Sequence, residues 1–153
     1  MIGIIDYNMG NLASVYNACK LIDADATIVK NPEDLKKFNR VILPGVGAYK
    51  DAMEHLIQTG MNEAVYEFAK TGKPMIGICL GMQLLFESSQ EFGHSDGLGL
   101  IDGHVIKFDK SKMHEDFKIP HMGWNTIKNK ENPLFEGLKD PYLYFVHSYH
   151  AVT

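Results

Sequence analysis

A cysteine between two glycines stands where an apolar segment changes into an amphipathic one. Residues 77–81 read Gly-Ile-Cys-Leu-Gly, after the apolar run 74–78 and before the amphipathic run 82–86. This order predicts a strand that turns sharply into a helix, with Cys79 at the corner. The two glycines allow the strand and helix backbones to approach closely, because neither carries a Cβ. Only the side chain of Cys79 would then project outward.

Such a corner suits a nucleophile. A helix N-terminus carries unpaired N–H groups and the positive end of the helix dipole, and both favour a thiolate over a thiol. The competing interpretation makes Cys79 a small buried hydrophobic residue at the end of a strand. The other cysteine, Cys19, has apolar neighbours at helical spacing and is expected in the core. Cys79 is therefore the candidate catalytic residue.

Short apolar segments alternate with helical segments in the first half of the chain. Strands are expected at 2–6, 26–30, 40–43 and 74–79, and helices at 12–22, after Asn31, at 48–59 and at 61–71. Parallel strands joined by helices predict an α/β fold, a three-layer sandwich around a mostly parallel, doubly wound sheet. After Phe86, runs at 98–101, 105–108 and 142–152 are expected to add antiparallel strands to the same domain.

Size, composition and charge exclude several classes of protein. The 153 residues are expected to form one domain. No apolar stretch approaches the ~20 residues of a membrane span, and the N-terminus lacks the basic start of a signal peptide, so we expect a cytoplasmic protein. A net charge of −4 with scattered lysines leaves no basic surface for nucleic acid. Seven histidines and two cysteines without metal-binding spacing predict neither a metal site nor a cofactor.

Three loops are expected beyond the carboxyl ends of the strands, where open α/β sheets bind their ligands. They are 6–11, 44–49 and the corner at Cys79. The Pro-Gly-Val-Gly sequence at 44–47 allows the backbone to approach a ligand and to direct N–H groups at it. Beside the Leu80 N–H, these groups would form an oxyanion hole. The alternative is a nucleotide phosphate loop, but neither G-x-G-x-x-G nor a Walker lysine pattern occurs.

Six segments in a fixed order carry a family resemblance: IGIIDYNMGNL at 2–12, ILPGVGAY at 42–49, GICLGMQLLF at 77–86, GLGLIDG at 97–103, PHMGWN at 120–125 and YFVHSYHA at 144–151. Together they resemble the class I glutamine amidotransferases, and most of all the glutaminase subunits of imidazole glycerol phosphate synthases. The resemblance implies a flavodoxin-like fold and hydrolysis of glutamine through a thioester on Cys79. It also implies a heterodimer in which ammonia passes to a cyclase partner for histidine biosynthesis.

The match of motifs assigns roles to individual residues. Cys79 would be the nucleophile, with an oxyanion hole made by Val46, Gly47 and Leu80. Gln83 follows Cys79 by four residues and would share its helical face. No periodicity anchors Glu91, so an exposed glutamate is the alternative there. The residues expected to hold glutamine or to line its pocket are Gly45, Gln83, Glu91, His147, Ser148 and Tyr149.

The catalytic base of this family is a histidine in a late His-Pro-Glu motif, and no such motif occurs in the 153 residues. We therefore expect either a C-terminally truncated domain or a protein that is not a competent glutaminase. His147 and His150 are poor substitutes, because residues three apart on a strand face opposite sides and neither has a suitable acidic neighbour.

The segment 120–125 surrounds the only tryptophan of the chain. It is either a core aromatic or part of a docking edge, where tryptophan and methionine are common. By resemblance, the residues that face the cyclase are His121, Met122, Trp124 and Asn125. Three alternatives to the histidine-pathway glutaminase stay open. They are a subunit for nucleotide-sugar or glycan modification, a non-catalytic docking or regulatory subunit, and another cysteine protein such as a redox sensor.

Overall fold

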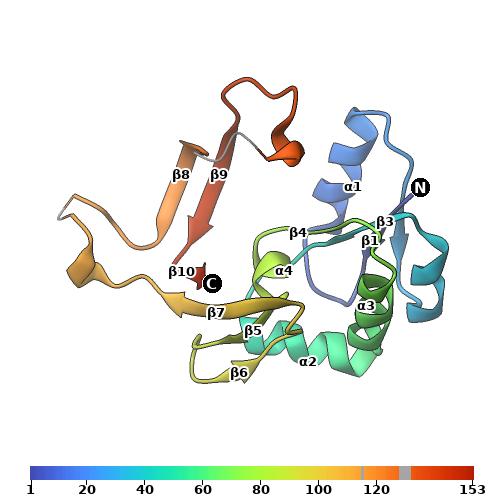
Figure 1. Ribbon diagram of the computed structural model, residues 1–153, viewed down its shortest axis with the longest axis horizontal. Helices are drawn as coiled ribbons and strands as arrows, with labels where there is room; N and C mark the ends of the chain where they lie inside the picture. The colour runs from blue at the N-terminus through green and yellow to red at the C-terminus, as the bar shows by residue number, and fades with distance from the viewer. Residues whose placement is uncertain (115, 128–131) are drawn as a thin grey trace. The chain divides into compact units, whose positions relative to one another are not determined.

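The computed structural model describes residues 1–114, 116–127 and 132–153 (Figure 1). They form two compact units, the first made of residues 1–106 with 151–153 and the second of residues 107–150. Each unit is described by itself. The single domain expected from the sequence stays a prediction.

A four-stranded parallel sheet forms the centre of the first unit. Its strands are β1 (Ile2–Ile5), β2 (Ala26–Val29), β3 (Arg40–Leu43) and β4 (Met75–Gly77), in the order β2-β1-β3-β4. Every neighbouring pair is parallel, which confirms the predicted sheet. The strand order reverses at β1 and β3, and in open α/β sheets ligands bind at the carboxyl ends of the strands beside such a reversal.

Helices cover both faces of this sheet, so the predicted three-layer arrangement is confirmed. Helix α1 (Leu12–Leu21) lies on one face, and α2 (Tyr49–Thr59) and α3 (Met61–Lys70) lie on the other (Figure 1). The Asn11 side chain caps α1 by accepting a hydrogen bond from the Ser14 N–H at 3.2 Å.

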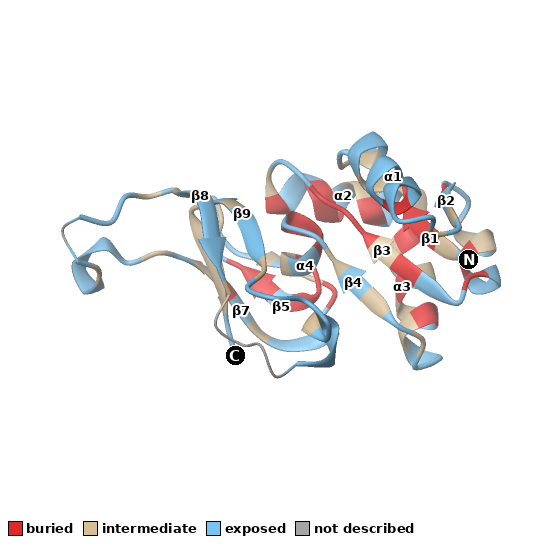
Figure 2. Cartoon of the chain, turned by 90° about the horizontal axis from the view of Figure 1, so that it is seen from above, coloured by how far each residue is buried: buried red, intermediate tan, exposed pale blue. Residues whose placement is uncertain are grey.

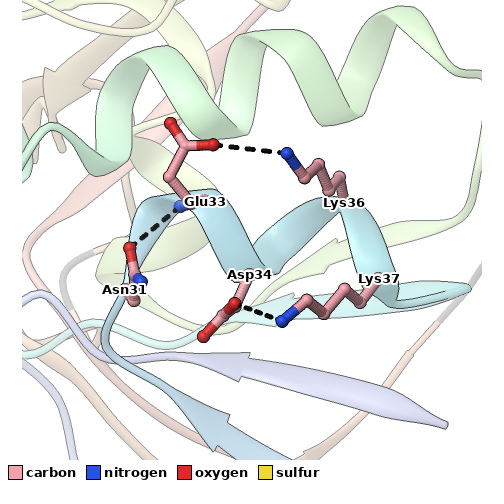
Figure 3. A network of polar contacts seen from close by, with 5 residues as sticks. All are labelled: Asn31, Glu33, Asp34, Lys36 and Lys37. Carbon is pink, nitrogen blue, oxygen red and sulfur yellow. Dashed lines mark hydrogen bonds and ion pairs between the residues drawn. The ribbon is translucent and has the colours of Figure 1, made fainter.

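A short 3₁₀-helix, η1 (Pro32–Lys37), follows β2 where the sequence predicted a short helix (Figure 3). The Asn31 side chain accepts a hydrogen bond from the Glu33 N–H at 3.1 Å, which confirms the predicted cap. The ion pairs along this helix join Glu33 to Lys36 at 3.3 Å and Asp34 to Lys37 at 2.6 Å.

Buried side chains gather on β1, β3, α2 and α3 (Figure 2). Burial of this kind is the main favourable contribution to folding, at about 25 cal/mol per Å² of apolar surface. The members of this core include Ile4, Ile5, Val41, Leu43, Leu56, Met61 and Val65.

The segment after Cys79 differs from the prediction of a helix through Phe86. Helix α4 contains only Leu80–Gln83, and strand β5 (Phe86–Ser89) starts three residues later. The backbone carbonyls at 84–86 accept hydrogen bonds from N–H groups of residues 98–101, at 2.8 to 3.0 Å. Pairing with this distant segment therefore outweighs the helical periodicity of residues 82–86.

A second sheet has the strand order β10-β7-β5-β6. Strand β6 (Ser95–Asp96) is antiparallel to β5, whereas β7 (Ile101–Lys107) is parallel to it. The predicted runs at 98–101 and 105–108 are not two separate strands, because residues 101–107 form the single strand β7, which is parallel to β5. Strand β6 already pairs with one edge of β5 as a hairpin, so the chain reverses once more and β7 runs parallel along the other edge. Strand β10 is Tyr149–Val152.

The second unit contains an antiparallel pair, β8 (His121–Thr126) and β9 (Tyr142–His147). Here the predicted antiparallel addition is confirmed. Two short 3₁₀-helices, η2 (Lys110–Lys112) and η3 (Pro133–Phe135), complete the unit. Across residues 1–114, 116–127 and 132–153, no helix combines the length and the apolar character that crossing a membrane requires.

Adjacent residues of α2 provide a test of this core. Leu56 is fully buried, whereas 58% of Ile57 is exposed. We expect Leu56→Ala to lower the free energy of unfolding by about 2–5 kcal/mol, because it leaves a cavity. The matched Ile57→Ala should change it by about 0.5 kcal/mol or less. Urea denaturation measures both, and equal losses would contradict the assignment of Leu56 to the core.

Candidate active site

Cys79 stands at the corner between β4 and α4, as predicted. Its backbone has φ 55° and ψ −119°, a conformation that residues with a Cβ rarely adopt. The side chain is exposed, so the interpretation of Cys79 as a buried hydrophobic residue was wrong. Hydrogen bonds hold the corner on both sides. The Ile78 N–H donates to the Leu43 carbonyl, and the Met82 N–H donates to the Cys79 carbonyl, each at 3.0 Å.

The two glycines beside Cys79 have the predicted steric role. A Cβ on Gly81 would overlap the carbonyl oxygen of Leu43. A Cβ on Gly77 would lie 2.6 Å from the amide nitrogen of Met82. Both positions therefore require glycine, because the atoms in the way belong to the backbone and cannot rotate aside.

The loop of residues 44–47, called the PGVG loop below, packs directly on this corner. A Cβ on Gly45 would lie 2.5 Å from the Gly81 amide nitrogen and 3.0 Å from the Leu80 Cβ. Gly47 adopts a left-handed φ of 91°. In the part of the chain that the structure describes, the N–H groups of Val46, Gly47 and Leu80 make no hydrogen bond. Their predicted role as donors to an oxyanion formed beside Cys79 stays a prediction.

Tyr7 holds the start of the PGVG loop. Its hydroxyl donates a hydrogen bond of 2.9 Å to the carbonyl of Pro44. The side chain is fully buried, and burial raises the pKa of Tyr7, so the hydroxyl keeps the proton that it donates. The neighbouring Met9 lies under Gly47, where an added Cβ would approach the methionine Cε to 3.2 Å. The loop after β1 therefore supports the loop after β3.

Glu91 binds the start of α2, two residues after the PGVG loop. Its Oε2 accepts a hydrogen bond of 2.8 Å from the Tyr49 N–H, the first residue of α2. The Glu91 N–H in turn donates to the Ser89 hydroxyl at 3.1 Å. Glu91 is half-buried, so the alternative of a freely exposed glutamate was wrong. Its predicted contact with glutamine stays a prediction.

Tyr49 is the second fully buried tyrosine near the loop. Burial, with a smaller contribution from Asp96, raises the pKa of Tyr49 to about 12. A Cβ on Gly97 would collide with its hydroxyl. Among the described residues this hydroxyl has no hydrogen-bond partner. Among the described residues the Tyr49 side chain therefore contributes to α2 through packing, whereas the Tyr7 side chain anchors the loop through a hydrogen bond.

The remaining candidates are divided between the two units. Gln83 ends α4, and its N–H donates to the Cys79 carbonyl at 3.2 Å, which confirms its place one turn after the cysteine. His147, Ser148 and Tyr149 belong to the second unit, and their place in a glutamine pocket stays a prediction. His147 pairs with the Tyr149 carbonyl at 2.7 Å and with His121 at 3.3 Å, so its described partners include no carboxylate.

Strand β8 presents the tryptophan segment on the surface of the second unit. Trp124 is 70% exposed and Met122 is 61% exposed, so the interpretation of Trp124 as a core residue was wrong. The Trp124 ring packs edge-on against Tyr144 at 5.6 Å, and Met122 pairs with Val146. His121 is half-buried and Asn125 is exposed. These side chains leave an apolar surface on the β8–β9 pair.

Sequence reasoning missed the residues that hold the PGVG loop. Tyr7 lies two residues after β1, and Tyr49 opens α2, but an isolated tyrosine gives no signal that separates an anchor from an ordinary core residue. Within residues 1–114, 116–127 and 132–153, no three or more histidine, cysteine, aspartate or glutamate side chains form a group that could hold a metal ion.

The two buried tyrosines allow a matched test of the loop anchor. Tyr7→Phe removes a hydroxyl that satisfies the Pro44 carbonyl, so we expect a loss of about 1–3 kcal/mol in the free energy of unfolding. Tyr49→Phe removes a hydroxyl without a partner and should be neutral or stabilising. Thermal and urea denaturation of the two variants measures the difference. A Tyr49→Phe variant that loses as much as Tyr7→Phe would contradict this account.

The strained backbone of Cys79 gives a second test. Glycine adopts the observed φ of 55° freely, whereas alanine retains the Cβ that opposes it. We therefore expect Cys79→Gly to be more stable than Cys79→Ala by about 1 kcal/mol or more, the size of such backbone strain. Denaturant unfolding of the two variants gives the comparison. If Cys79→Ala proved the more stable, the corner would not be strained in this way.

Comparison with known proteins agrees with this geometry. The family model described as glutamine amidotransferase class-I matches residues 3–153. The imidazole glycerol phosphate synthase subunit HisH of Sulfurimonas denitrificans is 61% identical, over 99% of this chain and 74% of the relative. The protein of that name from Wolinella succinogenes is 60% identical, over 100% of this chain and 76% of the relative.

A solved structure described as a glutamine amidotransferase shares the fold, with a TM-score of 0.68 and 19% identity. The alignment covers 95% of this chain and 70% of that structure. The likeness supports the predicted flavodoxin-like α/β class. A chain with this corner, this loop and these relatives belongs to the class I glutamine amidotransferase family.

Proposed function

We propose that this chain is the glutaminase subunit of an imidazole glycerol phosphate synthase. It hydrolyses glutamine to glutamate and ammonia, and a cyclase partner uses the ammonia in histidine biosynthesis. Relatives that are 60% and 61% identical carry that name, which favours this role over nucleotide-sugar or glycan modification. The single observation that carries the chemistry is the exposed Cys79 thiol at a strained corner, beside the unpaired N–H groups of Leu80 and the PGVG loop.

The first step is attack by the Cys79 thiolate on the side-chain carboxamide carbon of glutamine. A C–S bond forms, and the electrons of the C=O bond move onto the oxygen. The N–H groups of Leu80, Val46 and Gly47 would donate hydrogen bonds to this oxyanion. One such donor contributes about 10²- to 10³-fold to the rate of acyl transfer.

The second step breaks the C–N bond. The oxyanion re-forms the carbonyl, the nitrogen accepts a proton, and ammonia departs. A thioester on Cys79 remains. Water then attacks the thioester carbonyl, the same N–H groups bind the second oxyanion, and the C–S bond breaks. The products are glutamate and the regenerated thiolate of Cys79. Of the two protons that water releases, one restores the acid that protonated the nitrogen and the other converts ammonia to ammonium, so atoms and charge balance.

Both steps need a base and an acid to move protons. Within the 153 residues no His-Pro-Glu motif occurs, and the described partners of His147 include no carboxylate. The chain spans about three quarters of the length of the two relatives above. Among the described residues we therefore assign a nucleophile and oxyanion donors, and we assign no base.

The other sequence assignments are part of the same proposal. The Gly45 backbone and the Gln83 and Glu91 side chains would hold glutamine beside Cys79, and His147, Ser148 and Tyr149 would line the rim of its pocket. The apolar surface of β8 and β9 would bind the cyclase subunit in a cytoplasmic heterodimer, since exposed tryptophan and methionine are typical of interfaces. The residues proposed for this contact are His121, Met122, Trp124 and Asn125.

Cysteine variants test the proposed reaction in the complex with the cyclase subunit. We expect Cys79→Ala to lower the release of ammonia from glutamine by about 10⁴-fold or more, because the covalent step is lost. Intact mass should show one adduct from a glutamine-mimicking electrophile, and excess glutamine should prevent it. The matched Cys19→Ala removes the buried thiol and should leave both results unchanged. Labelling at Cys19, or labelling at Cys79 that glutamine does not affect, would contradict the proposal.

A further inference from the structure

Asp6 is the only buried carboxylate among the described residues, with 7% of its surface exposed. It directly follows β1, and its N–H donates to the Val29 carbonyl at 2.9 Å, so its backbone continues the pairing of β1 with β2. A buried carboxylate is unfavourable for folding unless hydrogen bonds or an opposite charge compensate it. The proposed reaction gives Asp6 no task, so its burial has no explanation in that chemistry.

Both oxygens of the Asp6 carboxylate have a partner. Oδ1 accepts a hydrogen bond of 3.0 Å from the Asn8 N–H, and Oδ2 lies 3.5 Å from the Lys30 Nζ. The first contact closes a turn in which Asn8 adopts a left-handed φ of 68°, a conformation that few residues other than glycine adopt. The second contact is weaker, because the Lys30 side chain is 79% exposed and water screens the pair. The bond to Asn8 therefore determines the course of the chain after β1.

This turn presents three residues to the PGVG loop. Tyr7 donates to the Pro44 carbonyl at 2.9 Å. A Cβ on Gly10 would lie 3.3 Å from the Pro44 Cβ. A Cβ on Gly47 would lie 3.2 Å from the Met9 Cε. Both ends of the PGVG loop are therefore in contact with the turn.

We propose that Asp6 is a positioning residue for the glutaminase reaction. Its carboxylate fixes the turn after β1, and the turn holds the PGVG loop so that the Val46 and Gly47 N–H groups face the oxyanion formed at Cys79. This role rests on the proposed function. It depends on the oxygen that accepts from Asn8 and not on the charge.

Three substitutions at position 6 provide a graded series of acceptors. Asp6→Asn keeps an amide oxygen for the Asn8 N–H, and the exposed Lys30 can turn away from the new NH₂ group into water. Asp6→Ser keeps a hydroxyl acceptor, which closes such a turn more weakly, and Asp6→Ala has none. In the complex with the cyclase subunit, kcat should stay within about 3-fold of wild type for Asp6→Asn and fall about 10- to 100-fold for Asp6→Ala. KM should be nearly unchanged in each, because a displaced donor weakens only the transition state.

A double-mutant cycle with Tyr7→Phe separates positioning from a general loss of stability. If Asp6 acts through the contact of Tyr7 with Pro44, removing both groups should lower kcat by clearly less than the product of the two single effects. A loss of stability alone would reduce the amount of folded protein and leave kcat per folded enzyme unchanged. Asp34→Ala serves as the control and should retain kcat, because the ion pair of Asp34 with Lys37, at 2.6 Å, lies within η1.

Hydrogen exchange of the Asn8 amide gives a readout that does not depend on catalysis. Asp6→Ala should accelerate this exchange about 10-fold or more, and Asp6→Asn should leave it nearly unchanged. Asp6→Ser, expected between the two, carries the exchange measurement and the cycle if Asp6→Ala does not fold.

Four results would each overturn the inference: unchanged exchange in Asp6→Ala, a wild-type kcat in Asp6→Ala, a kcat for Asp6→Asn as low as that for Asp6→Ala, or multiplicative effects in the cycle. A wild-type complex that releases no ammonia would overturn the proposed function instead. The exchange rates would then still decide whether Asp6 holds the turn.

Discussion

The absence of a Cβ at Gly81 is the constraint on which the site depends. It allows the start of α4 to lie against the Leu43 carbonyl, with Gly45 of the PGVG loop against the Gly81 nitrogen. Because the two backbones are this close, Cys79 adopts a left-handed φ and its side chain is directed outward. The same approach leaves the Leu80 N–H beside the loop instead of inside a hydrogen-bonded turn. In the proposed reaction, the nucleophile and the oxyanion donors would thus arise from one packing contact.

Contacts from two other segments of the fold hold this arrangement. The Pro44 carbonyl binds Tyr7 from the segment after β1, and the Tyr49 N–H binds Glu91 from the segment after β5. The parallel sheet brings the ends of β1, β3 and β4 to one edge, which is why residues far apart in sequence meet there. The strained backbone of Cys79 is unfavourable for folding, and the buried core of β1, β3, α2 and α3 offsets it.

Sequence alone predicted the elements whose signals are local. Apolar periodicity predicts the strands up to β4 and the helices α1, α2 and α3, and the capping residues predict the Asn31 cap. The spacing of Gly77 and Gly81 about Cys79 predicts the role of these two glycines at the corner. The short α4 and the parallel β7 were not predictable in this way, because hydrogen bonds from residues 98–101 decide them. The contact of Glu91 with Tyr49 joins residues 42 positions apart, and no pattern of one sequence reports such a pairing.

The most direct test of the account is a crystal structure of the complex with a glutamine-derived acyl group on Cys79. We expect the acyl oxygen about 3 Å from the Leu80 N–H and from an N–H of Val46 or Gly47, with the Glu91 carboxylate still bound to Tyr49. An acyl oxygen directed into solvent, with neither loop nor corner N–H in reach, would contradict the claim that this packing contact builds the oxyanion hole.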